Sequence, residues 1–104
     1  EGEVYEVAYK QDIALGKAYI ISEVSGERAE YEIEIESLDY SGDEENKGIL
    51  FKVTDERLLD LTGGIVQGMS GSPIIQNGKM IGAVTHVFVS DASMGYGIFI
   101  EKML

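Results

Sequence analysis

Residues 64 to 84 read GIVQGMSGSPIIQNGKMIGAV, and this stretch does most to decide the fold. Asn77-Gly78 stands between two short apolar runs, which is the strongest short-range signal for a β-hairpin with a type I′ turn. In such a two-residue turn the flanking residues pair directly. The sequence therefore predicts a hairpin in which Gln76 faces Lys79.

If the ladder behind this turn is unbroken, the paired residues can be counted back from the turn. It predicts three further pairs: Ile75 with Met80, Ile74 with Ile81, and Ser72 with Ala83. If the pairing continued, Ser70 would lie opposite Thr85. Opposed residues share a sheet face and their chain neighbours point the other way. The register thus predicts Thr85 on the side of Ser70, with His86 pointing away.

The rest of the chain shows short strands separated by turns. Residues 29–38, AEYEIEIESL, alternate apolar residues with glutamates, as a half-buried antiparallel strand does. One helical turn is expected within 54–64. Further strands are expected at 4–9, 17–24, 49–53, 72–76, 79–89 and 96–104. Strands at this spacing predict one all-β domain over residues 1–104, an antiparallel barrel or sandwich of about six to seven strands.

Composition excludes several classes of function. The net charge of −11 argues against nucleic-acid binding through a basic patch. Most of this acid fits one solvated strand face, although it would also attract a basic partner. The absence of cysteine excludes disulfides, thiolate metal sites and a cysteine nucleophile. The acidic segment 39–48 matches no calcium-loop spacing, and the sequence indicates no other metal or cofactor. No stretch approaches the roughly 18 apolar residues that a membrane helix needs.

The segment GMSGSP, residues 68–73, has the residue types that a serine nucleophile needs. Glycines on both sides of Ser70 allow a tight turn with positive φ and a close approach of a substrate carbonyl. Backbone N–H groups in such a turn are available to an oxyanion. The alternative is an ordinary loop leading into a strand.

His86 is the only histidine in the chain. The predicted register argues against a role as base for Ser70. Two interpretations of His86 remain: it is a partly buried strand histidine, or its side chain lines a substrate pocket. Asp91 is a second candidate for the lining of that pocket.

GMSGSP, followed by a hairpin and IGAVTH, resembles the chymotrypsin-like serine peptidases, whose nucleophile lies in G-x-S-G-x-P. The longer run over residues 49–104 is similar to the stage IV sporulation protein B peptidases of endospore-forming bacteria. The resemblance implies a self-cleaving serine endopeptidase with a membrane anchor and a PDZ domain. Such an enzyme is exported from the forespore to the space between the forespore membranes. There it cuts a membrane-bound regulator of the intramembrane protease that processes a late sigma factor.

Carried over to this chain, the resemblance implies Ser70 as nucleophile and Asp55 as the acid of a triad. Gly68 and the N–H of Ser70 would form the oxyanion hole. Substrate would bind in extended form along Thr85, His86 and Val87.

Asp55 has an alternative role as N-cap of the expected helical turn, holding the N–H of residue 57 or 58. Asp60 is a weaker candidate for the acid.

The general-base histidine of that family lies upstream, and no histidine precedes His86 here. The resemblance therefore implies one barrel of a larger peptidase domain, inactive until its upstream half is supplied. A non-catalytic β-barrel that captures peptides along residues 85–87 is the alternative. Self-association through a surface that the missing half would cover is a further expectation.

Overall fold

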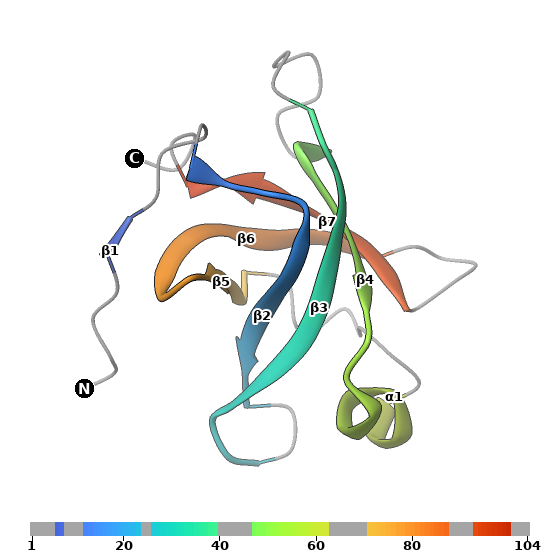
Figure 1. Cartoon of the computed structure of the whole chain (residues 1–104). Helices are drawn as coiled ribbons and strands as arrows, with labels where there is room; N and C mark the ends of the chain where they lie inside the picture. The colour runs from blue at the N-terminus through green and yellow to red at the C-terminus, as the bar shows by residue number, and fades with distance from the viewer. Residues whose placement is uncertain are drawn as a thin grey trace.

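The computed structural model describes residues 6–7, 12–23, 26–39, 47–62, 71–87 and 93–100 (Figure 1). Its elements are β1 (Glu6–Val7), β2 (Gly16–Ser22), β3 (Ala29–Leu38), β4 (Ile49–Val53), α1 (Glu56–Thr62), β5 (Pro73–Gln76), β6 (Lys79–Val87) and β7 (Met94–Phe99). Within the described residues, these bounds fall within two residues of the expected ones at β2, β5 and the start of β7. The strands β3 and β4 match their expected bounds.

The strands close into an antiparallel barrel. Around the barrel the order is β2, β3, β4, β7, β6, β5 and back to β2, with each neighbouring pair antiparallel. The short β1 pairs in parallel with the start of β6, at Lys79 and Met80. Closure removes the open strand edges that a flat sheet would expose. The predicted all-β barrel is confirmed.

The hairpin β2–β3 is regular. Seven residue pairs run from Gly16↔Ile35 to Ser22↔Ala29 without a shift. In β3, Tyr31, Ile33 and Ile35 are buried, and the glutamates between them face outward. The alternation expected for residues 29–38 is therefore confirmed.

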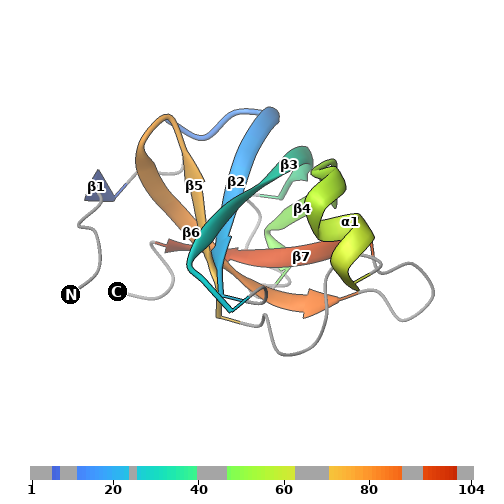
Figure 2. The same cartoon turned by 90° about the horizontal axis from the view of Figure 1, so that it is seen from below.

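The barrel interior is filled by branched aliphatic and aromatic side chains. The largest fully buried ones are Phe51, Phe99, Ile20, Ile33, Ile35, Ile49, Leu58, Ile74, Ile81 and Val53. Leu58 comes from α1, the helix that follows β4. Figure 2 shows this helix lying beside the strands of the barrel. The expected helical turn is thus a seven-residue helix that contributes to the core.

The turn of the β5–β6 hairpin matches its sequence signal. Asn77 has φ 54° and Gly78 has φ 77°, the positive values that a type I′ turn requires at both central residues. The first two pairs behind it, Gln76↔Lys79 and Ile75↔Met80, are the predicted ones.

The register then shifts by one residue. Ile74 faces Gly82 and Pro73 faces Ala83, so the predicted Ile74–Ile81 and Ser72–Ala83 pairs are wrong. The extra residue on β6 is Ile81, which makes a β-bulge. The bulge explains why β6 departs from alternation, because bulges bend a strand and increase its twist.

Strand β6 also approaches β7 closely. A Cβ added to Gly82 would lie 2.0 Å from the carbonyl oxygen of Ile98, and one added to Gly97 would lie 2.8 Å from that of Ala83. Two glycines therefore allow the backbones of β6 and β7 to meet where the barrel closes.

Candidate active site

Part of the expected site lies outside the described residues. Ser70, Gly68 and Asp91 belong to that part, so the expected nucleophile, oxyanion hole and second pocket residue stay predictions. The description resumes at Gly71, directly after Ser70. For Val87 the structure describes the backbone as the last residue of β6.

Gly71 and Ser72 form a second irregularity opposite β6. The N–H of Gly71 donates to the Val84 carbonyl at 2.7 Å, and the N–H of Val84 donates to the Ser72 carbonyl at 2.9 Å. Gly71 has φ 91°. This is the pattern of a G1 bulge, in which a glycine with positive φ and its successor oppose one residue. The backbone conformation of the bulge therefore explains why a glycine follows Ser70. The hydrogen bond of Gly71 also ties the chain next to Ser70 to β6.

A further bulge lies in β6 where it pairs with β7. Val84 faces Gly97 and His86 faces Tyr96, which leaves Thr85 as the extra residue. The Thr85 hydroxyl donates to the Tyr96 carbonyl at 3.2 Å, and His86 Nδ1 lies 3.1 Å from Thr85 Oγ1. The structure thus brings together two of the expected substrate-binding residues. His86 is exposed, which contradicts the interpretation of a partly buried histidine.

These bulges bear on the predicted relation between Ser70 and Thr85. The ladder on which that prediction depended shifts by one residue at Ile81 and again at Gly71. Ser70 itself is outside the described residues, so its position opposite Thr85 is untested, but the unbroken count behind it is wrong.

The two sides of β6 are paired over different lengths in the described part of the chain. Pairing with β5 reaches Pro73↔Ala83, whereas pairing with β7 continues to Val87↔Gly95. The segment from Thr85 to Val87 therefore extends past the end of β5.

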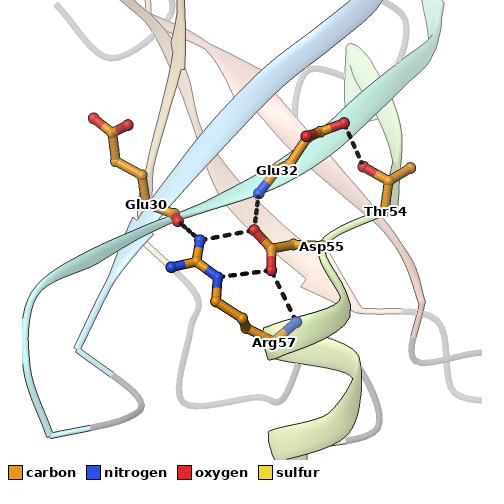
Figure 3. Close-up of polar contacts among 5 residues, drawn as sticks. All are labelled: Glu30, Glu32, Thr54, Asp55 and Arg57. Carbon is orange, nitrogen blue, oxygen red and sulfur yellow. Dashed lines mark hydrogen bonds and ion pairs between the residues drawn. The ribbon is translucent and has the colours of Figure 1, made fainter.

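Asp55 lies between β4 and α1 and caps the helix (Figure 3). Its Oδ1 accepts the N–H of Arg57 at 2.9 Å, the contact of an N-cap with the second helical residue. Its Oδ2 accepts the N–H of Glu32 on β3 at 2.9 Å. The cap contact expected for Asp55 is confirmed, and the same carboxylate joins α1 to β3.

The Arg57 side chain completes the environment of Asp55. Its Nε donates to Oδ1 at 3.0 Å and its Nη2 to Oδ2 at 2.8 Å, a bidentate ion pair. Nη2 also donates to the Glu30 carbonyl, and the guanidinium lies 5.2 Å from the Tyr31 ring centroid. Each Asp55 oxygen therefore accepts two hydrogen bonds.

These donors lower the pKa of Asp55 well below its ordinary value of 3.8. The hydrogen bonds from the Arg57 side chain are the largest cause. Desolvation opposes the shift, and the N–H groups of Glu32 and Arg57 add to it. Asp55 is ionised at neutral pH, as a triad acid would be. That role stays a prediction, and it requires an imidazole N–H to replace one of the present donors.

Arg57 was missed by sequence reasoning. The spacing Asp-x-Arg at a helix start is a weak signal, because residues two apart on a helix do not face each other. Only the turn of the chain before α1 brings the two side chains together. Asp60 lies in α1, but its side chain is not among those described.

The described ranges contain neither a candidate metal cluster nor a membrane-spanning helix. No group of three or more histidine, cysteine, aspartate or glutamate side chains there is arranged to hold a metal ion. No helix among these residues is long and apolar enough to cross a membrane.

The chain matches a known protein family. A family model described as SpoIVB peptidase S55 matches residues 1–104. No curated protein and no solved structure matches the chain. The family match spans the barrel, the capped helix and the bulged hairpin, and it agrees with the resemblance seen in the sequence. The chain therefore belongs to the SpoIVB peptidase family.

Proposed function

We propose that this chain is the nucleophile-bearing part of a serine endopeptidase, with Ser70 as nucleophile. The observation that carries the proposal is the G1 bulge at Gly71 and Ser72, within a domain of a peptidase family. The bulge ties the residue after Ser70 to Val84, one position from Thr85. Such a tie would help to hold the proposed nucleophile beside the strand that would bind the substrate.

The remaining roles follow the family pattern. The N–H groups of Gly68 and Ser70 would stabilise the oxyanion. Substrate would lie extended along Thr85, His86 and Val87, as in β-strand addition. Pairing with β7 up to Val87 keeps this segment extended, which supports that role.

The proposed reaction needs a general base, which the family pattern places upstream of Ser70, where this sequence has no histidine. Ser70 Oγ attacks the scissile carbonyl while an imidazole takes its proton, and the same imidazole later protonates the leaving amine as the C–N bond breaks. The histidine would come from the upstream half of the peptidase domain. Loss of the base lowers the rate by about 10⁴ to 10⁶ in serine peptidases, so the chain alone would be inactive.

Asp55 would orient this histidine. Its ionised carboxylate is suitable as an acceptor for an imidazole N–H. The incoming histidine would have to displace one of the two Arg57 side-chain donors, because the cap itself is held by the backbone N–H of Arg57.

The biological setting is proposed from the family. The full-length enzyme would be membrane-anchored and act in the space between the forespore membranes. It would cleave itself and a membrane-bound regulator of an intramembrane protease, as part of sporulation signalling. No cofactor is part of this proposal.

A fluorophosphonate probe tests the nucleophile. We expect no rapid labelling of the chain alone and rapid labelling of Ser70 once the histidine-bearing upstream segment is added. Ser70→Ala should abolish labelling, and Ser72→Ala should retain it. Labelling that persists in Ser70→Ala would overturn the assignment, and rapid labelling of the isolated chain would overturn the missing-base part.

A peptide-binding module is the second candidate, and the extended segment of β6 that β7 holds up to Val87 favours it. In this case the chain would bind extended peptides and Ser70 would never be labelled, with or without the upstream segment. Peptide titrations of the Ser70→Ala variant, set beside the labelling experiment, separate the two candidates.

A further inference from the structure

The Thr85 hydroxyl lies between two partners whose roles can be assigned. A carbonyl oxygen can only accept, so the single hydroxyl proton is donated to the Tyr96 carbonyl at 3.2 Å. Thr85 Oγ1 must then act as acceptor toward His86 Nδ1 at 3.1 Å. In a neutral imidazole, the Nδ1–H tautomer satisfies this contact and leaves the lone pair on Nε2.

The β-bulge is what makes this contact possible. In a regular strand, neighbouring side chains point to opposite faces of the sheet. Thr85 is the extra residue between the pairs Val84↔Gly97 and His86↔Tyr96, so its side chain is re-aimed toward β7. Two consecutive side chains of β6 thereby come within hydrogen-bond distance.

The surroundings place His86 at the surface of the barrel. His86 is exposed, and it faces Tyr96, which in turn faces Leu50 on β4. The ammonium group of Lys47 lies 5.5 Å from the Tyr96 ring centroid. His86 belongs to the segment proposed to hold the substrate, and it thus lies next to Tyr96, a half-buried aromatic residue of β7.

We propose that Thr85 is a positioning residue that holds His86 in the Nδ1–H tautomer, so that Nε2 accepts a hydrogen bond from a donor side chain of the bound peptide. The identity of that peptide as substrate rests on the proposed function, whereas the tautomer and the acceptor atom do not. When a peptide covers Nε2, this acceptor needs a hydrogen-bond donor from the peptide. An apolar side chain of the same size is disfavoured there, because it leaves the lone pair of Nε2 without a hydrogen bond. His86 would therefore favour substrates with an amide, hydroxyl or ammonium group at this position.

Nitrogen NMR of the ¹⁵N-histidine-labelled chain, at a pH where the imidazole is neutral, reads the tautomer directly. We expect the Nδ1–H form in the wild type and in Thr85→Ser, which keeps the hydroxyl. Thr85→Val keeps the shape and removes the acceptor, so the Nε2–H form should predominate there. A wild type in the Nε2–H form, or a Thr85→Val variant unchanged from wild type, would overturn the proposal.

Two blocked tripeptides, Gly-Gln-Gly and its norleucine analogue, test the acceptor on the same chain. We expect the glutamine peptide to move the Nε2 resonance of the wild type and of Thr85→Ser, and the norleucine peptide to leave it in place. Equal effects of the two peptides, or none from either, would overturn the selection of donor side chains. Neither measurement uses Ser70, so a failure of the serine peptidase proposal would appear separately, in the labelling experiment.

Discussion

The hairpins β2–β3 and β5–β6 lie side by side in the barrel but differ in regularity. The first holds one register through seven pairs, with glutamates outside and isoleucines inside. The second changes register at Ile81 and ends in a G1 bulge at Gly71. Outside the two hairpins, β6 bulges at Thr85 against β7, and β3 bulges at Glu36 against β4. The candidate site residues of β6 lie in the irregular hairpin.

The difference indicates a division of labour. A regular ladder buries one face and exposes the other, which suits a scaffold. Bulges re-aim side chains and tie loops to strands, which suits a site. The predictions below test whether the irregular region depends on its close backbone contacts and how α1 is attached to the regular one.

The largest effect is expected at the crossing of β6 and β7. Gly82→Ala would place a Cβ 2.0 Å from the Ile98 carbonyl oxygen, so the two backbones must separate. We expect a loss of about 3 kcal/mol in the free energy of unfolding, measured by urea denaturation. Glu34→Ala, at an exposed position of β3, is the control and should cost less than about 0.5 kcal/mol. Similar losses in the two variants would contradict the comparison.

The next effect concerns the attachment of α1 to β3. Asp55→Asn removes the charge that Arg57 and the N–H of Glu32 stabilise, and should cost about 1 kcal/mol at pH 7. The folded pKa of Asp55 is lowered, so its contribution is complete above 3.8 and is lost as the pH falls below that value. Urea denaturation at steps from pH 7 to pH 3 should show the wild type losing its advantage only at the acid end. A constant difference across this range would contradict the role of charge.

A stability effect of the same size, and the sharpest test of the site, is expected in a comparison of two glycines. Gly71 and Gly26 have φ of 91° and 95°, and a Cβ at either would have nothing within 4 Å. Alanine at each should therefore cost about 1 kcal/mol through backbone strain alone. Only Gly71→Ala should slow labelling of Ser70 in the reconstituted peptidase. Equal labelling rates in the two variants would show that the bulge does not position Ser70.

Much of the fold was predictable because local patterns decide it. The alternation in residues 29–35 leaves one acceptable register in the β2–β3 pairing, since a one-residue slip would bury the glutamates. Asn77-Gly78 determines the turn, because few dipeptides adopt positive φ at both positions. Asp55 before ERLLDLT indicates a helix cap, and the cap contact is present.

The register of β6 was not predictable beyond the turn for the opposite reason. Residues 80–84, MIGAV, are apolar or small throughout, so a slip by one residue buries no charge. The pattern tolerates either register, and counting from the turn cannot detect the extra residue. The Asp55–Arg57 pair was missed because it depends on the path of the chain into α1.

By itself, the sequence determined that the chain is β-rich, where the tight turn lies, and which face of β3 is buried, because each depends on neighbouring residues. Only the tertiary structure decided where β6 bulges, and hence that Thr85 and His86 touch. A strand that must pair with β5 on one side and β7 on the other has to bend, and the place of the bend is set by closure of the whole barrel.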